Sequence, residues 1–151
     1  MIADCQIWKD AFETFAPLCD IIKASEEDID AIYPDGDHDR TAKQILNQGP
    51  KLVIITRGKD GVSAWHKNGT TVSLESHKVL VKDTVGAGDS FFAALLMHLQ
   101  GHDALHKDRL SDLSREGLLA ALSFANRAAA ITCSRFGADL PRQSDLASGS
   151  V

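Results

Sequence analysis

The chain has 151 residues, of which 44% are hydrophobic and 25% charged, a composition typical of a soluble globular protein. Sixteen Lys and Arg against 21 Asp and Glu give a formal net charge of -5, which disfavours a nucleic-acid-binding protein because such proteins usually carry a basic face. The longest apolar runs are far shorter than the roughly 18 residues of a membrane span, so we predict no transmembrane segment and no membrane partner.

The cysteines and the first residues bear on the compartment. Cys5, Cys19 and Cys133 are odd in number, widely spaced and without a C-x-x-C pair, which favours a reducing environment. Residues 1–6 have neither the basic start nor the apolar stretch of a signal peptide. The sequence therefore predicts a cytoplasmic protein.

The first part of the chain is predicted to alternate helices and strands. Ser25 is followed by three acidic residues, a pattern typical of a helix N-cap with charges suited to the helix dipole. The β-branched run 52–56 is typical of a parallel strand that is buried on both faces. The predicted elements are a helix at 7–18, a strand at 20–24, a helix at 25–33, a helix at 40–48 and a strand at 52–56.

The second part opens with a hairpin pattern and ends in helices. Asn68-Gly69 separates two short β-type runs, and Asn-Gly between such runs is a strong hairpin signal. After the hairpin the sequence predicts a strand at 78–82, a helix at 90–100, a surface loop at 101–114, an Ala-rich helix at 116–134 and a polar, frayed tail at 143–151.

The segment from Asp83 to Asp89 is the most informative for chemistry. In it the small residues Gly86, Ala87 and Gly88 let backbone N–H groups converge on an anion, and the helix behind them adds its positive end. An acidic residue at the mouth of such a site would repel an anion, but it suits a general base in phosphoryl transfer. From these residues alone two interpretations remain, namely Asp89 as a base and Asp89 as an ordinary N-cap behind a glycine turn.

A resemblance to a known family favours the first interpretation. Residues 83–96 resemble, without a gap over fourteen positions, the C-terminal signature of the PfkB carbohydrate kinase family, also called the ribokinase family. Residues 22–28, 53–61 and 124–138 resemble further segments of that family and occur in the family's order. Ser25 and residues 133–138 are most similar to fructokinases.

The resemblance implies a ribokinase-like α/β fold with a mainly parallel sheet flanked by helices. It also implies transfer of the ATP γ-phosphate to a sugar hydroxyl, with fructose as the expected sugar and another ketose, a sugar acid or a nucleoside as alternative acceptors. The resemblance implies that Asp89 is the general base and that the amides of Gly86, Ala87 and Gly88 form the anion hole. The residues expected to bind the nucleotide are Thr56, Gly58 and Gly61 at the phosphates and ribose, and Asn126 and Gly137 near the adenine.

The resemblance also implies two cation sites. Asp83 and the Val85 carbonyl occupy the positions at which some family members hold a monovalent cation such as K⁺. The family's N-x-x-E motif organises Mg²⁺ through water, and Ser25 and Asp28 stand at its positions here. A hydroxyl and a shorter carboxylate can still orient water around Mg²⁺, so Asp28 is the candidate for that role.

The resemblance covers the C-terminal half of the family's domain. Residues 1–142 are expected to form a partial ribokinase-like domain, the nucleotide-binding half, followed by a flexible tail at 143–151. The N-terminal half, with the first strands, the sugar-contacting residues and a small lid, is expected to be absent. Because half a sheet leaves an open edge, we expect a dimer or a complementary chain to cover it. The alternative is a catalytically silent nucleotide-binding or interaction module.

Histidines and tryptophans are interpreted as structural residues. His98, His102 and His106 recur at every fourth position, but a zinc site would require the helix to continue through Gly101, and we expect a solvated helix end instead. Trp8 and Trp65 are expected to pack rather than to stack on a sugar. The Walker pattern G-x-x-x-x-G-K-[ST] is absent, which argues against a P-loop enzyme.

Overall fold

The computed structural model describes residues 5–34 and 36–147, which form two compact units. The described residues up to Gly58, together with Ser63–Ser73, make up the first unit. Lys59–Val62 and the described residues from Leu74 onward make up the second unit. Each unit is described by itself.

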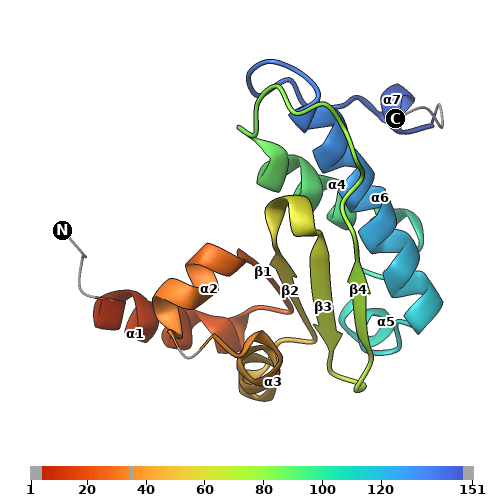
Figure 1. Ribbon diagram of the computed structural model, residues 1–151. Helices are drawn as coiled ribbons and strands as arrows, with labels where there is room; N and C mark the ends of the chain where they lie inside the picture. Colours follow the sequence, from red (N-terminus) through yellow and green to blue (C-terminus); the bar gives the residue numbers. More distant parts are fainter. Residues whose placement is uncertain (1–4, 35, 148–151) are drawn as a thin grey trace. The chain divides into compact units, whose positions relative to one another are not determined.

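Within the described residues, four strands form one mixed sheet in the order β1-β2-β3-β4 (Figure 1). β1 and β2 are parallel, with Ile21 opposite Leu52 and Ser25 opposite Thr56. β3 and β4 form the predicted hairpin, and the Ser63 and Ser73 hydroxyls lie 2.8 Å apart across it. The α/β class is confirmed, with the parallel pairing at β1 and β2. The strands are β1 Ile21–Ser25, β2 Leu52–Thr56, β3 Val62–His66 and β4 Thr71–Leu74.

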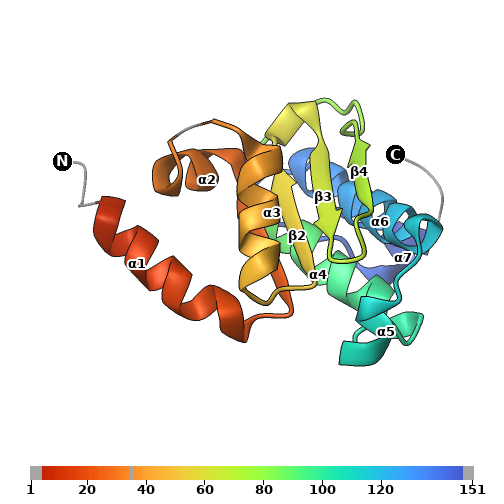
Figure 2. The same ribbon diagram turned by 90° about the horizontal axis from the view of Figure 1, so that it is seen from below.

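Helices cover the sheet of the first unit. Leu52 to Ile55 of β2 have no exposed surface, as the continuous apolar run predicts. Figure 2 shows α3 lying along β2, and the Trp65 indole Nε1 donates to the Asp39 carboxylate of α3 at 2.9 Å. The helices of this unit are α1 Cys5–Phe15, the 3₁₀ turn η1 Ala16–Leu18, α2 Glu26–Ile32 and α3 His38–Gln48, and a second 3₁₀ turn, η2 Gly58–Asp60, continues into the second unit.

The second unit is built on two helices, α4 and α6, that lie side by side (Figure 1). Alanines at their contact allow close packing, and Ala94 of α4 joins Ala128 and Ile131 of α6 in one buried cluster. Ser114 caps α6 by accepting the Gly117 amide at 3.1 Å. The helices of this unit are α4 Ala87–Gly101, α5 Lys107–Ser111, α6 Arg115–Cys133 and α7 Gln143–Ala147.

The predicted strand at 78–82 is wrong. The segment is not part of any strand, and Leu80 and Val81 are 82% and 58% exposed. Its far end is held instead by α6, because the Lys82 amide donates to the Cys133 carbonyl at 2.8 Å. A β-type sequence forms a strand only where a neighbouring strand accepts its backbone hydrogen bonds.

Two short helices stand where loop and tail were predicted. α5 lies inside the predicted loop 101–114 and buries Leu110, which is 1% exposed. α7 occupies Gln143–Ala147, the start of the predicted flexible tail, and buries Leu146. Residues 148–151 of that tail lie outside the described residues. Both helices are stabilised by one buried leucine rather than by a long apolar pattern.

α4 ends at Gly101, one residue beyond the predicted end at 100, and a turn follows it, so the expected helix end is confirmed. The His98 and His102 rings stack with their centroids 4.2 Å apart. Burial, and next the charge of His102, lower the pKa of His98.

The described residues contain no group of three or more His, Cys, Asp or Glu side chains that could hold a metal. None of the helices at residues 5–34 and 36–147 has the length and apolar character needed to cross a bilayer.

Candidate active site

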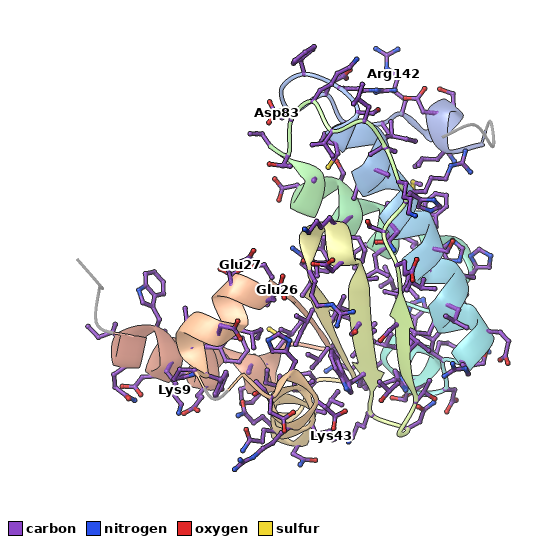
Figure 3. All side chains as sticks on the ribbon, in the orientation of Figure 1. Lys9, Glu26, Glu27, Lys43, Asp83 and Arg142 are labelled. Carbon is purple, nitrogen blue, oxygen red and sulfur yellow. The ribbon has the colours of Figure 1, made fainter. Side chains whose placement is uncertain are left out.

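Asp83 joins two loops of the second unit. It lies on the segment that leads into α4 (Figure 3), and its Oδ1 accepts the Val85 amide at 3.0 Å. Its Oδ2 accepts the Gly137 amide at 3.0 Å, from the loop that follows α6. The Val85 amide, and then the Gly137 amide, hold the pKa of Asp83 below its usual value. Three residues named from the sequence, Asp83, Val85 and Gly137, are therefore in direct contact.

The glycine turn forms the N-terminus of α4. Gly86 is the N-cap with φ +79°, and a Cβ there would lie 3.3 Å from the Ala138 Cβ, so a small residue with left-handed freedom is required. The Ala87 amide donates to the Thr84 carbonyl at 3.2 Å, and the Ser90 amide makes the first helical bond, to Gly86, at 2.9 Å. By position, the amides of Gly88 and Asp89 precede that first bond and point away from the helix body.

Asp89 is exposed in the first turn of α4, three residues after the N-cap. It is therefore an acidic residue at the amino end of the helix. A negative group is stabilised at this end of a helix dipole. We name Asp83, Val85, residues 86–89 and Gly137 the glycine-turn group.

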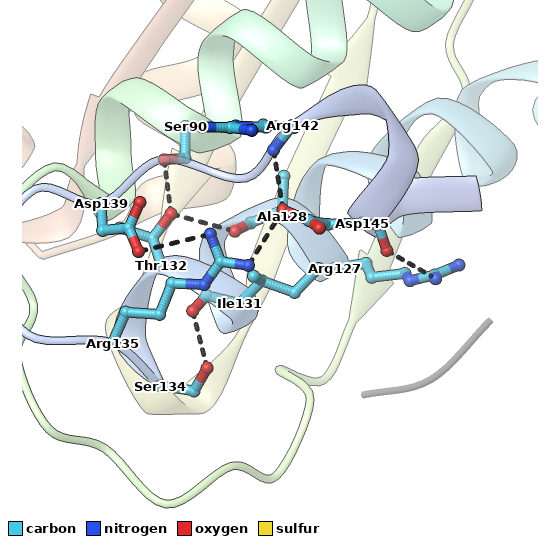
Figure 4. A network of polar contacts seen from close by, with 10 residues as sticks. All are labelled: Ser90, Arg127, Ala128, Ile131, Thr132, Ser134, Arg135, Asp139, Arg142 and Asp145. Carbon is cyan, nitrogen blue, oxygen red and sulfur yellow. Dashed lines mark hydrogen bonds and ion pairs between the residues drawn. The ribbon is translucent and has the colours of Figure 1, made fainter. Parts of the chain in front are cut away.

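A buried hydroxyl pair fastens this turn to α6. The Ser90 and Thr132 hydroxyl oxygens lie 2.6 Å apart, and the Thr132 hydroxyl donates to the Ala128 carbonyl at 3.2 Å (Figure 4). Ser90 and Thr132 are 4% and 0% exposed. Sequence reasoning did not single out this pair, because nothing in the pattern links two hydroxyls 42 residues apart.

A second group of predicted residues lies in the first unit, at the carboxyl ends of β1 and β2. Ser25 is paired in register with Thr56, whose hydroxyl donates to the Ala24 carbonyl at 3.3 Å. Gly58 follows β2 with φ +49°. Ligands of α/β proteins bind outside the carboxyl ends of parallel strands. We name Ser25, Asp28, Thr56 and Gly58 the strand-end group.

Ser25 and Asp28 form a reciprocal capping box. The Ser25 hydroxyl accepts the Asp28 amide at 3.1 Å, and the Asp28 Oδ2 accepts the Ser25 amide at 3.2 Å. Figure 3 shows Glu26 and Glu27 in the same first turn of α2. The replacement of the family's N-x-x-E motif thus has a local structural role of its own.

Gly61 and Asn126 have structural roles in the second unit. Gly61 is buried with φ +97°, and a Cβ there would lie 2.0 Å from the Leu74 carbonyl oxygen. Asn126, 9% exposed on α6, donates from its side-chain amide to the Glu75 carbonyl at 3.2 Å.

The chain matches the model of the pfkB family carbohydrate kinases over residues 1–145. It belongs to this family. A fructokinase from Rhizobium leguminosarum bv. trifolii is 43% identical over 103 residues, which are 68% of this chain and 31% of the relative.

Solved structures of family members have the same fold. A ribokinase from Thermotoga maritima superposes with a TM-score of 0.69 at 28% identity, covering 89% of this chain and 43% of that one. A fructokinase from Xylella fastidiosa with bound ATP gives a TM-score of 0.82 at 22% identity, over 91% and 44% of the two chains. A fructokinase variant from Vibrio cholerae O395 with bound fructose, ADP and potassium ion gives 0.77 at 25% identity, over 93% and 44%. The ribokinase-like fold is therefore confirmed.

The chain spans about a third of the length of the curated relatives it matches. It covers 31% of the Rhizobium fructokinase and 34% of a 5-dehydro-2-deoxygluconokinase from Halalkalibacterium halodurans, to which it is 28% identical over 127 residues, or 82% of this chain. The residues matched by the family model, 1–145, include both the strand-end group and the glycine-turn group.

Asp83→Asn is expected to weaken the fold in a pH-dependent way. Because the folded-state pKa of Asp83 is lowered, its stabilisation is present above the unfolded value of about 3.9 and is lost as the pH falls through the folded value. The thermal midpoint of the variant should lie a few degrees below that of the original protein at pH 7, and the gap should close in stronger acid. A gap that stays constant from pH 7 to pH 2.5 would contradict this assignment.

Proposed function

We propose that this chain carries the nucleotide-binding part of an ATP-dependent sugar kinase, with fructose as the sugar. The observation that carries the proposal is the glycine turn at the N-terminus of α4, with the exposed Asp89 carboxylate in its first turn. The 43% identity to a fructokinase supports the choice of sugar.

In the proposed reaction Asp89 accepts the proton of the sugar hydroxyl as that oxygen attacks the γ-phosphorus in line. The bond from the γ-phosphorus to the bridging oxygen breaks, and ADP leaves with the electron pair. The amides of Gly86, Ala87 and Gly88 would serve as the anion hole for the phosphoryl oxygens. The Gly88 amide precedes the first helical bond, whereas the Ala87 amide would share its contact with the Thr84 carbonyl. Positioning and charge stabilisation are the main requirements of phosphoryl transfer, and no covalent enzyme intermediate is needed.

Nucleotide contacts are proposed in each unit by itself. In the first unit, Thr56 and Gly58 would line the phosphates and ribose of a nucleotide. In the second unit, Gly61 would line the phosphates and ribose, and Asn126 and Gly137 would lie near the adenine. The packing roles of Gly61 and Asn126 mean that substitutions there act first on the fold. The carbonyl of Val85 and the carboxylate of Asp83 would hold a potassium ion, as the potassium-bound Vibrio fructokinase suggests by likeness.

Asp28 is the proposed contact for Mg²⁺. The described residues lack a cluster of metal-ligating side chains, but Mg²⁺ keeps several waters and binds through one or two carboxylates and substrate phosphates. The exposed Asp28 carboxylate fits such a water-mediated contact. When bound, Mg²⁺ would neutralise charge on the phosphates.

A catalytically silent nucleotide-binding or interaction module is the second candidate. β1 is an edge strand of the described sheet, and we propose that a complementary chain or a second copy pairs there in the active form. A cytoplasmic location completes the proposal.

Titration calorimetry with ATP and Mg²⁺, followed by a coupled assay for ADP release with fructose on the same sample, tests the proposal. A working kinase binds the nucleotide and releases ADP only when fructose is present. Binding without fructose-dependent ADP release identifies the silent module. Absence of binding would overturn both candidates.

A further inference from the structure

α7 is packed onto the body of the second unit by its single large apolar residue. Leu146 is 7% exposed and belongs to the same buried cluster as Ala94, Ala128 and Ile131 of α4 and α6. The helix has only five residues, too few to be stable without such contacts. The polar contacts of α7 therefore decide which other segments of the second unit it is attached to.

Asp145 is the polar centre of this attachment (Figure 4). Its Oδ2 accepts Nη2 of Arg135 at 2.9 Å and the backbone amide of Arg142 at 2.9 Å. Its backbone carbonyl accepts Nη2 of Arg127 at 3.3 Å. The Arg142 amide, and then the Arg135 guanidinium, lower the pKa of Asp145, so the carboxylate is charged at neutral pH.

Arg135 continues the connection into the loop that follows α6. Its Nη1 lies 3.6 Å from the Asp139 carboxylate, so one guanidinium lies between two acids. The Asp139 amide donates to the Gly137 carbonyl at 2.8 Å, and the Gly137 amide donates to Asp83. Contacts thus run without a break from α7 to the glycine-turn group.

The loop at 134–139 has little apolar anchoring of its own. Phe136 is 78% exposed, and Gly137, with φ +68°, has no side chain to pack. Besides the close approach of Ala138 to Gly86, polar contacts at both ends of the loop hold its position. Arg135 and Asp145 supply those on the α7 side.

We propose that Asp145 and Arg135 are positioning residues, which tie α7 to the loop at 134–139 and thereby fix Gly137 and Asp83 beside the glycine turn. If Gly137 and Asp83 lie in a nucleotide site, loss of the Asp145–Arg135 contact would also weaken nucleotide binding, and this part rests on the proposed function. The coupling between α7 and the glycine turn does not depend on it. Neither residue is expected to touch the nucleotide.

Asp145→Asn is the sharpest variant. The asparagine oxygen can still accept the Arg142 amide, but the charge that holds Arg135 is lost. We expect the amide of Gly137 and the amides of residues 85–89 to exchange with solvent roughly two- to fivefold faster, the range for loss of a partly exposed ion pair. Residue-resolved hydrogen exchange by NMR measures this, with the middle of α6 as an internal reference.

Asp103→Asn is the matched control. Asp103 pairs with His106 and Arg109 at 3.5 and 3.8 Å, beyond the other end of α4, and asparagine tolerates its φ of +56°. This variant should leave the exchange at residues 85–89 and at Gly137 unchanged. Asp145→Glu, which restores the charge, should recover most of the lost protection.

Arg135→Lys provides an independent route to the same result, because an ammonium cannot span two carboxylates as a guanidinium does. Faster exchange at Gly137 in both variants supports the proposal. Exchange that rises only within residues 142–147 overturns it. If the original protein and all variants fail to bind Mg²⁺ and ATP while the exchange effect is present, the proposed function fails and the positioning role stands.

Discussion

Under the proposed function, Asp89→Asn is expected to lower the rate of fructose-dependent ADP release by about a hundredfold to ten-thousandfold, the range for loss of a general base. Asparagine has nearly the shape of aspartate but cannot accept the proton of the sugar hydroxyl. The nucleotide affinity should change little, because the amides of the glycine turn remain. Steady-state kinetics and calorimetry on the same preparations separate these two effects.

Glu116→Gln is the matched control for this variant. Glu116 is an exposed acid in the first turn of α6, so its loss removes a carboxylate from a comparable place at a helix N-terminus. Its turnover should equal that of the original protein. If Asp89→Asn retained full turnover, Asp89 would be only a helix-terminal acid, and the base would have to be sought elsewhere.

The strongest sequence signals were those that depend on local pattern. The run at Leu52–Thr56 predicted a buried strand, and Asn68-Gly69 predicted the hairpin; both are confirmed. The segment at 78–82 does not form the predicted strand. Whether such a segment becomes a strand depends on a partner strand, which no local sequence pattern reveals. Trp8 was expected to pack and is 63% exposed, while Trp65 is buried as expected.

The candidate site was only partly readable from the sequence. Resemblance pointed to Asp83, Val85 and Gly137, and the structure brings these three into contact. The contacts that support them are long-range. Ser90 with Thr132 and Arg135 with Asp145 carry no motif, because single polar contacts between distant segments are decided by packing.

The capping box at Ser25 and Asp28 shows how a functional motif and a structural motif can share residues. Ser25 was predicted as an N-cap from its own sequence, and the structure confirms this. The same two residues stand in the family's magnesium motif. A loss of activity on changing Asp28 would therefore need a stability measurement before any metal role was assigned.

Gly61→Ala is expected to destabilise the fold strongly, by about 4 kcal/mol in the free energy of unfolding. The added Cβ would lie 2.0 Å from the Leu74 carbonyl oxygen and 2.9 Å from the Glu75 Cα, both backbone atoms that cannot rotate away. The left-handed φ of +97° adds a conformational cost for any L side chain. Urea denaturation measures the loss, and a very low yield of folded protein would agree with it.

Gly69→Ala separates the two parts of this cost. Gly69 has nearly the same φ, +90°, but nothing lies within 4 Å of its Cβ position, so only the conformational cost of about 1–2 kcal/mol applies. Equal losses in the two variants would contradict a steric role for Gly61. A much larger loss of unfolding free energy in Gly61→Ala would mean that close backbone packing alone requires glycine at this position. Weaker nucleotide binding by Gly61→Ala could then not be assigned to a lost phosphate contact.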